Sequence, residues 1–521
     1  MSTVGELAEA ATMPRGRRMG NGPVGIIDIG SNSIRLVLYE RASRAPTVFF
    51  NEKVLAGLGE DLSEHGRLSD ESMSRAIAAI SRFVTITEAA DAQVLTIIAT
   101  AAARDASNGS VFINEIEAIT GQPVKVLSGL EEAAMAANGV LCGFWQPDGV
   151  VGDLGGGSLE LIDVGDDGLG PGDSFPLGTL RLRGDAKGDL AAASKIASDT
   201  LSRAPQLPLL TGRAFYAVGG TWRSLVRLHM VGCDYPISVL HNYEVPGDEM
   251  AQFCDRILRD GIDKMPGLNA VSKNRRALVP WGAAVMREVI RRGRPDTVVA
   301  SALGVREGII YEGLGTLEKR RDPLLIAAEE LALLRSRSPQ QAAELITWTG
   351  QVFEALGVRE SEQEKRLRAA GCLLSDIGWR AHPDYRGDQA IAIVSNVSLY
   401  GIDHQGRGYI ALTLMERYGG LENSHHGAAA ETVCPPRLEH RARLLAAAFR
   451  LAYVFAPGLP GILPRTKIER EAGMLVITLP DDLAALDGER PRRRLKQLAR
   501  LVNFDGEIRI ARSVPQLETA S

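Results

Sequence analysis

Cysteine is scarce in this sequence, and its five copies show no regular spacing. They stand apart at Cys142, Cys233, Cys254, Cys372 and Cys434, and no two of them form a CxxC pair. This scatter argues against a zinc site and against a disulfide framework. It is typical of a reducing compartment, so we expect the protein to be cytoplasmic.

Long apolar segments are missing as well. No run of about 18 apolar residues occurs, so we expect no membrane span. The first residues lack an apolar stretch of signal-peptide length and are small, polar and basic, with Arg15, Arg17 and Arg18. We therefore interpret residues 1–22 as a disordered tail.

The chain also lacks a large excess of charge. Its formal net charge is −5, so the molecule as a whole does not attract polyanions, and we expect no nucleic-acid partner. Any binding of a polyanion must come from local basic clusters. The candidates are Arg291, Arg292 and Arg294; Lys319 to Arg321; and Arg490, Arg492 to Arg494 and Lys496. Each cluster, taken alone, is more typical of a solvated surface.

Apolar periodicity predicts strands and helices in a repeated order. Strands are expected at 24–29, 34–40 and 46–52, and again at 149–153, 158–164 and 172–177. Helices and strands alternate after each set, which predicts two similar lobes with helices against their sheets. Residues 324 to 465 show an almost wholly helical pattern, and the residues after them a small α+β unit.

Two segments in equivalent places of these lobes carry the same motif. Residues 28–36 read Asp-Ile-Gly-Ser-Asn-Ser-Ile-Arg-Leu, and residues 153–161 read Asp-Leu-Gly-Gly-Gly-Ser-Leu-Glu-Leu. In each, a strand delivers an acidic residue, a glycine-containing turn follows, and a second strand leaves. Two such loops facing each other would hold a polyphosphate, with the Asp28 and Asp153 carboxylates beside it for a divalent metal.

The side chains of the two loops suit phosphate binding. Ser31, Asn32 and Ser33 offer hydroxyls, an amide and backbone N–H groups, although the same residues are common in ordinary turns. Gly155, Gly156 and Gly157 let the backbone approach a ligand, Ser158 adds a hydroxyl, and Glu160 adds a carboxylate. The second loop does not match a G-x-S-x-G nucleophile elbow, and the chain has no P-loop.

Two further segments lie where a strand is expected to lead into a helix. Gly219, Gly220 and Thr221 offer amides to another phosphate or a nucleoside, or they simply allow close helix–strand packing. Glu131 and Glu132 stand near a helix start, where they oppose the helix dipole. One of them is a candidate to orient and deprotonate an attacking water. Arg104 is placed to reach the same cleft, or it is a surface arginine.

Together these motifs resemble the exopolyphosphatase / guanosine pentaphosphate phosphatase family, within the actin-like ATPase superfamily. The resemblance is specific over residues 24–315 and looser beyond them, where the chain is similar to the long, four-domain form. It implies an α/β fold of duplicated actin-like (ribonuclease H-like) lobes, then an all-helical HD-like domain and a small α+β domain. The implied boundaries are 23–136, 137–319, 323–465 and 466–521, after the tail.

The resemblance implies magnesium-dependent release of terminal orthophosphate from inorganic polyphosphate, with another divalent metal as an option. By match, Asp28, Asp153 and Glu160 hold the metal, and the two loops bind phosphates. Arg104 and the segment Gly219 to Thr221 are assigned to phosphate binding too. The base is Glu132 or Glu131; we favour Glu132, but the sequence does not decide. The long form also implies a homodimer.

Three other functions remain open. The same residues suit a guanosine pentaphosphate 5′-phosphatase, acting on guanosine penta- or tetraphosphate. An actin-like-fold kinase would need an acceptor and a nucleotide pocket, for which no clear motif is present. A non-catalytic polyphosphate or alarmone sensor would use the same loops, but the intact Glu131, Glu132 and Glu160 argue against it.

The HD-like part lacks the pair that gives such domains their metal. Ser375 stands before Asp376 where a histidine is expected, so we predict no second metal centre. His382, His404 and the pair His425 and His426 restore no ligand spacing, and we interpret the pair as part of a loop.

Overall fold

The computed structural model describes residues 22–59, 62–421 and 432–511. Almost all of the predicted N-terminal tail, and His425 and His426, lie outside these ranges. The described residues form two units: 22–235 with 239–323, and 324–511 with 236–238. In the described part of the chain, no helix combines the length and the apolar character needed to cross a membrane.

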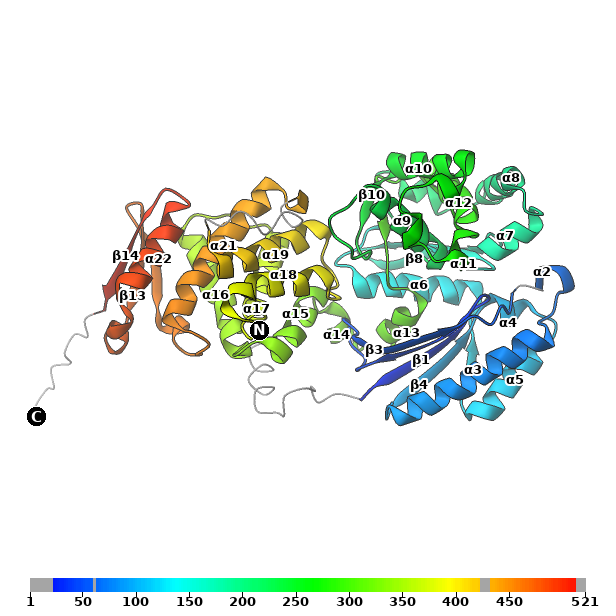
Figure 1. Cartoon of the computed structure of the whole chain (residues 1–521), viewed down its shortest axis with the longest axis horizontal. Helices are drawn as coiled ribbons and strands as arrows, with labels where there is room; N and C mark the ends of the chain where they lie inside the picture. The colour runs from blue at the N-terminus through cyan, green and yellow to red at the C-terminus, as the bar shows by residue number, and fades with distance from the viewer. Residues whose placement is uncertain (1–21, 60–61, 422–431, 512–521) are drawn as a thin grey trace, which may run out of the picture. The chain divides into compact units, whose positions relative to one another are not determined.

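The first unit contains two mixed sheets, and the one nearer the N-terminus has five strands (Figure 1). Its strand order is β3-β2-β1-β4-β5. The bounds are β1 Val24–Ile29, β2 Ile34–Tyr39, β3 Val48–Val54, β4 Val94–Ala99 and β5 Val124–Val126. β2 runs antiparallel to both β1 and β3, while β4 and β5 run parallel to β1. We call this sheet and its helices the first lobe.

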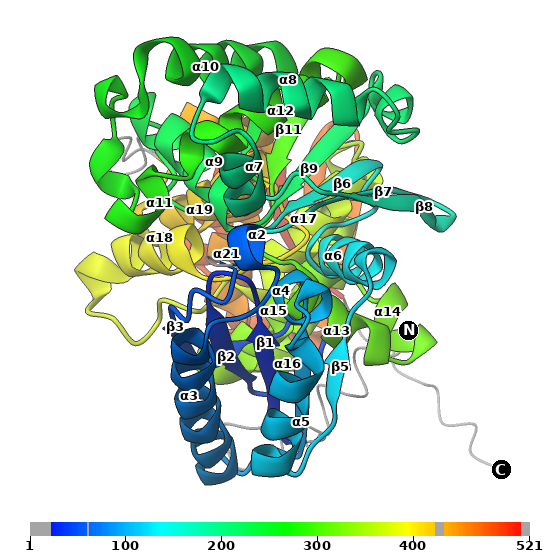
Figure 2. The ribbon, with the colours of Figure 1, turned by 90° about the vertical axis from the view of Figure 1, so that its right-hand side faces the viewer.

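Helices cover one face of this first sheet (Figure 2). They are α3 Asp70–Ala89, α4 Ala101–Asp105 and α5 Gly109–Thr120, while the short α2 Leu62–His65 lies beyond the end of the sheet. Ser69 begins α3, because its side chain accepts a hydrogen bond from the Ser72 backbone. Phe83 of α3 and Phe112 of α5 are buried with the aliphatic residues of β1 and β2. The strands of the first loop therefore stand on a rigid core.

The second sheet repeats the topology of the first. Its order is β10-β11-β9-β6-β7-β8, so β8-β7-β6-β9-β11 corresponds to the five strands of the first sheet in order and direction. The bounds are β6 Gly149–Leu154, β7 Leu159–Gly165, β8 Gly168–Phe175, β9 Ala214–Val218, β10 Glu244–Pro246 and β11 Thr297–Ala300. This second lobe meets the expectation of a repeated mixed α/β pattern, with β10 added at one edge.

The helices of the second lobe fall into two groups. The first group is α7 Thr179–Asp185, α8 Leu190–Leu201, α9 Gly220–Gly232, α10 Gly247–Asp260, α11 Lys273–Arg276 and α12 Val279–Gly293. The second group, α6 Gly129–Gly143 and α13 Val305–Gly313, lies between the two sheets (Figure 1), and α14 Thr316–Arg320 follows. α6 packs on the second sheet, and Ile310 of α13 packs on the first. A Cβ at Gly308 would stand 1.8 Å from the Met135 carbonyl oxygen, so the two helices touch through their backbones.

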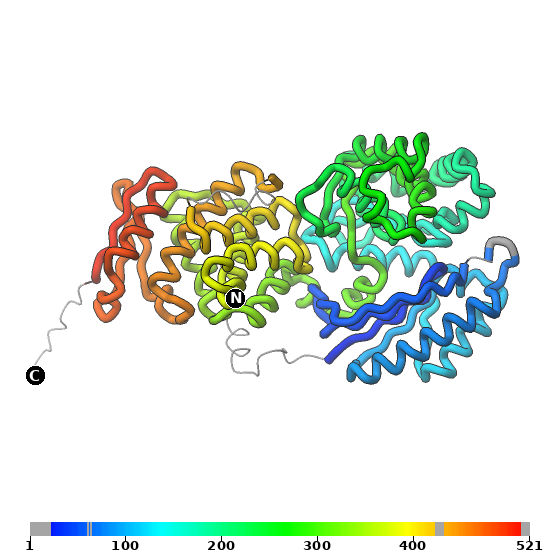
Figure 3. The backbone as a smooth tube through the Cα atoms, viewed as in Figure 1, coloured from blue at the N-terminus to red at the C-terminus, as the bar shows by residue number. Residues whose placement is uncertain are grey.

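The second unit is helical and then mixed (Figure 3). The helices are α15 Pro323–Arg335, α16 Pro339–Ala355, α17 Glu362–Leu373, α18 Arg386–Asn396, α19 His404–Gly419 and α21 Pro436–Phe455. A three-stranded sheet follows, β12 Lys467–Glu471, β13 Met474–Leu479 and β14 Asp505–Ile510, with α22 Glu489–Arg500 against it. Its order, β12-β13-β14, places β13 in the middle.

Candidate active site

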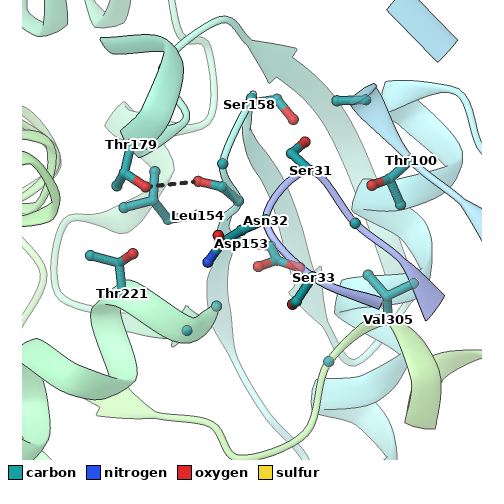
Figure 4. Close-up of a pocket in the computed structure, with 18 of the residues that line it drawn as sticks. Ser31, Asn32, Ser33, Thr100, Asp153, Leu154, Ser158, Thr179, Thr221 and Val305 are labelled. Atoms are coloured by element: carbon teal, nitrogen blue, oxygen red, sulfur yellow. Dashed lines mark hydrogen bonds between the residues drawn. The ribbon is translucent and has the colours of Figure 1, made fainter. Parts of the chain in front are cut away.

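The turns that follow β1 and β6 face one pocket of the first unit (Figure 4). Most of the predicted site residues line it. They are Asp28, Ser31, Asn32, Ser33, Glu132, Asp153, Gly155, Gly156, Gly157, Ser158, Gly219, Gly220 and Thr221. Three predicted residues do not line it: Glu131, Arg104 and Glu160.

The first loop is held by backbone contacts. The Gly30 amide donates to the Ser33 carbonyl at 3.1 Å, and the Gly59 amide donates to the Ser31 carbonyl at 2.7 Å. These bonds fix the turn and leave the Ser31 side chain beside the second loop. A Cβ at Gly156 would lie only 3.2 Å from that of Ser31. Glycine in the second loop therefore permits the close approach of the two loops.

The second loop rests on the start of α7. Leu180 donates its amide to the Gly156 carbonyl at 2.9 Å, and the Thr179 hydroxyl donates to the Gly155 carbonyl at 3.4 Å (Figure 4). Gly178 is the position with least room, since a Cβ there would come within 2.3 Å of the Gly157 backbone. Both loops are thus preformed by the fold.

Carboxylates gather at the base of the pocket, and their pKa values are shifted. Burial, with a smaller contribution from Asp28, raises the pKa of Asp153 to about 6. Burial and the neighbouring Asp153 raise the pKa of Glu160 to about 7. Burial, then Glu160 and Asp153, raise the pKa of Glu132 well above its ordinary value. A cluster of this kind is a functional-site candidate on physical grounds.

Glu160 lies behind the pocket. It pairs with Asp153 across β6 and β7, and its Oε1 accepts a hydrogen bond from the Ser174 hydroxyl on β8 at 2.8 Å. Its side chain is almost fully buried. Glu160 therefore acts on the pocket through its charge on Asp153 and Glu132.

Glu131 and Glu132 have different surroundings, although they are adjacent. Glu131 accepts hydrogen bonds from the Ser128 amide and hydroxyl, both at 2.9 Å, and so forms the capping box of α6. Its side chain is 47% exposed, whereas that of Glu132 is 11% exposed and lines the pocket. Among the residues that the structure describes, Glu132 Oε2 accepts no hydrogen bond, and it lies 3.6 Å from Arg104 Nη1.

Arg104 lies beside Glu132, and its charge acts on Glu160 as well. Its Nη1 also donates to the Leu127 carbonyl at 2.8 Å, which holds the guanidinium at the end of β4. The residue is not part of the pocket lining.

Basic residues line the pocket too, and none of them is among the site residues predicted from the sequence, although Arg35 lies within the motif at 28–36. They are Arg35, Lys53, Arg223, Arg275 and Arg306. Arg306 Nη1 lies 3.2 Å from Asp28 Oδ2. Arg275 lies against the backbone of Gly220, where a Cβ would stand 2.0 Å from Nη1. These residues come from β2, β3, α9, α11 and α13, so no local motif contains them all.

The site residues fit a divalent cation only in part. Throughout the described ranges, no group of three or more Asp, Glu, His or Cys side chains forms a ready-made metal cage. Mg²⁺ needs only one or two carboxylates when substrate phosphates and waters complete its shell. The buried Oε2 atoms of Glu132 and Glu160 lack hydrogen-bond partners in the described part of the molecule, which suits a bound cation or its waters.

Asp376 in the helical region is engaged by arginines. Arg337 Nε lies 2.7 Å from its Oδ2, and Arg417 Nη2 lies 3.0 Å from its Oδ1. Guanidinium groups therefore occupy the space around the carboxylate that a metal ion would need. This agrees with the absence of a histidine before Asp376.

In two of the three basic clusters found in the sequence, arginines form ion pairs with nearby glutamates. Arg291 and Arg292 pair with Glu288 at 2.8 and 3.3 Å, and Arg321 pairs with Glu318 at 3.2 Å. In α22, Arg492 pairs with Asp487 at 2.6 Å, and the other basic residues of that helix make no ion pair within the described residues.

Comparison with known proteins gives the family of this chain. The model of the Ppx/GppA phosphatase family matches residues 37–317, which is more than half of the sequence. The chain belongs to the Ppx/GppA phosphatase family. A second model, described as the C-terminal part of exopolyphosphatase, matches residues 324–507. The family predicted from the motifs is confirmed.

Two relatives differ in the part of the chain that they match. Exopolyphosphatase 2 of Mycobacterium tuberculosis is 26% identical over 310 residues, which are 56% of this chain and 97% of the relative. The guanosine-5′-triphosphate,3′-diphosphate pyrophosphatase of Vibrio parahaemolyticus is 25% identical over 482 residues, 87% of this chain and 91% of the relative. Among solved structures, an exopolyphosphatase from Cytophaga hutchinsonii is 20% identical with a TM-score of 0.49, covering 56% of this chain and 99% of its own.

Proposed function

We propose that this protein is an exopolyphosphatase that releases terminal orthophosphate from inorganic polyphosphate with the help of Mg²⁺. One observation carries the proposal: Asp28 and Asp153, at equivalent strand ends, line one pocket together with both glycine–serine loops. The loops suit a phosphate group, and the carboxylates suit its counter-cation. The family membership supports the same chemistry.

The reaction breaks the terminal phosphoanhydride bond with water as the nucleophile. Backbone amides of the two loops hold the terminal phosphoryl group and neutralise its charge. Glu132 accepts a proton from the attacking water, and a raised pKa suits a carboxylate for that role near neutral pH. Arg104, 3.6 Å away, orients Glu132. The leaving group is a polyphosphate shorter by one phosphate.

Asp28 and Asp153 would hold the magnesium ion, and Glu160 would act from behind Asp153. When bound, the ion supplies charge neutralisation on the phosphoryl oxygens. The position of both aspartates in the pocket lining supports this assignment, and the buried Oε2 atoms of Glu132 and Glu160, which lack hydrogen-bond partners among the described residues, suit the waters of such an ion. We extend the proposal to a cytoplasmic homodimer with four domains at the boundaries predicted from the sequence.

A guanosine pentaphosphate 5′-phosphatase is the second candidate. It is favoured by the Vibrio parahaemolyticus relative, which matches 87% of this chain rather than the first unit alone. Both activities would use the same pocket residues. The difference lies in what the far side of the pocket accepts beyond the cleaved phosphate.

The test measures orthophosphate release from long-chain polyphosphate and from guanosine pentaphosphate at equal concentrations, with and without Mg²⁺. Magnesium-dependent release mainly from polyphosphate supports the proposal, and release mainly from the nucleotide moves it to the second candidate. The absence of release from both would reject a hydrolase and favour a sensor.

A further inference from the structure

We propose that the phosphate chain of the substrate leaves the pocket across β2 and β3 of the first lobe, with Lys53 as the outermost cation that holds it. The inference rests on the proposed function and adds a direction and a specificity-determining residue to it.

A row of three side chains defines the direction. Asp28 on β1 lies opposite Arg35 on β2, and Arg35 lies opposite Lys53 on β3. Residues that face each other on neighbouring strands share one face of the sheet and stand about 5 Å apart. All three line the pocket. β3 is the edge strand, so the row runs from the carboxylate at the base of the pocket to the rim.

The outer pair of the row, Arg35 and Lys53, is unfavourable for the protein alone. Like charges directly opposite each other on adjacent strands destabilise a sheet. Arg35 is partly relieved by Asn51, whose Oδ1 accepts from its Nε at 2.7 Å. Lys53 has no ion-pair or hydrogen-bond partner in the part of the chain that the structure describes. Burial and then Arg275, Arg35 and Arg223 lower its pKa to about 8. A bound polyanion would offset this repulsion.

Two arginines on helices of the second lobe favour the same path of the phosphate chain. Arg223 of α9 and Arg275 of α11 line the pocket and lie close enough to Lys53 to affect its charge. The chain would therefore pass between cations on both sides. Its phosphates would meet Arg35 first and Lys53 last.

The equivalent row of the second lobe excludes an exit on that side. There Asp153 on β6 lies opposite Glu160 on β7, and Glu160 lies opposite Ser174 on β8. The positions of Arg35 and Lys53 are thus taken by a carboxylate and a hydroxyl. A polyanion crossing β7 would be repelled, so only the first lobe offers a cationic row.

The experiment compares Lys53→Gln, Lys53→Arg and Lys125→Gln on tripolyphosphate and on long-chain polyphosphate. Lys125 is exposed on β5, the opposite edge of the same sheet, and does not line the pocket. We expect K53Q to raise the KM for the long chain about tenfold, the cost of one charged contact. The KM for tripolyphosphate and kcat on both substrates should change little, and K53R and K125Q should behave as the natural protein.

Two results would overturn the inference. One is an unchanged KM of K53Q for the long chain; the other is an equal rise for both substrates, which would move Lys53 to the cleaved phosphate. Thermal denaturation of each variant separates a folding defect from a binding defect, and retention of low KM by K53R shows that charge is what matters. If the natural protein hydrolyses neither polyphosphate, the proposed function fails, and that outcome is recognised before any variant is compared.

Discussion

The two lobes have the same strand order but carry different chemistry. In both, the first strand ends in an aspartate, Asp28 or Asp153, that lines the pocket. On the next strand the first lobe has Arg35, and the second lobe has Glu160. The first strand of each lobe therefore supplies an aspartate to the pocket. The strand next to it carries a cation in the first lobe and a carboxylate in the second. The comparison shows how a duplicated fold makes an asymmetric site without changing its topology.

The largest effect is expected from the residues that the lobes share. Asp28→Asn and Asp153→Asn each keep the size of the side chain but remove a charge beside the phosphates. We expect kcat for polyphosphate to fall about a thousandfold in either variant, since metal and charge stabilisation are worth several kcal/mol. Orthophosphate release measures the loss, and circular dichroism checks the fold. If either variant kept a tenth of the activity, the equal role of the two aspartates would be rejected.

The next prediction separates the adjacent glutamates of α6. Glu132→Gln is expected to lower kcat about a hundredfold or more, the usual range for a general base. Glu131→Gln is its matched control: it should keep turnover and change stability by less than about 1 kcal/mol, because glutamine also closes a capping box and only the charge at the helix start is lost. Both are measured by steady-state kinetics and thermal unfolding. Equal turnover in the two variants would remove Glu132 from the base role.

The third prediction concerns the contact between α6 and α13, the two helices that lie between the sheets. Gly308→Ala on α13 brings a Cβ into the Met135 carbonyl of α6 and should destabilise the first unit by about 1–3 kcal/mol. Gly313→Ala on the same helix meets nothing within 4 Å and has no positive φ. It should stabilise the unit by up to about 1 kcal/mol. Urea unfolding compares them, and a neutral Gly308→Ala would show that α6 and α13 can separate at no cost.

The features that the sequence predicted correctly are local ones. The strands at 24–29 and 34–40 and the aspartates at the strand ends depend on a few neighbouring residues, and the structure has them. The alternation of helices and strands expected after the second set of strands is present too, although nothing was predicted for α7 or α10. Lys187 and Gly188, both at positive φ, separate α7 from α8. The Ser128-x-x-Glu131 spacing does signal a capping box, so the placement of Glu131 was accessible from the sequence.

The basic residues that line the pocket could not be predicted from the sequence in the same way. Arg223, Arg275 and Arg306 come from three different helices and share no motif, and other basic residues, such as Arg291, form local ion pairs instead. Which single cations meet at a pocket depends on tertiary packing. The sequence pattern also contains no sign that Arg35 and Lys53 are paired across two strands, because that register depends on the sheet.

The smallest effect is expected from pH, and it tests the cationic side alone. Lys53 is charged below its pKa of about 8 and loses its proton above it. The value of kcat/KM for long-chain polyphosphate, which reports the free enzyme, should therefore fall a fewfold between about pH 7.5 and pH 9.5. In Lys53→Arg the guanidinium stays charged over this range, so the fall should disappear. Lys53→Arg also controls for the pocket carboxylates, including Glu132 with its raised pKa, because these groups are the same in both proteins. If the fall persisted in the arginine variant, another group would be the one that titrates. Lys53 would then not distinguish the cationic row of the first lobe from the acidic row of the second in function.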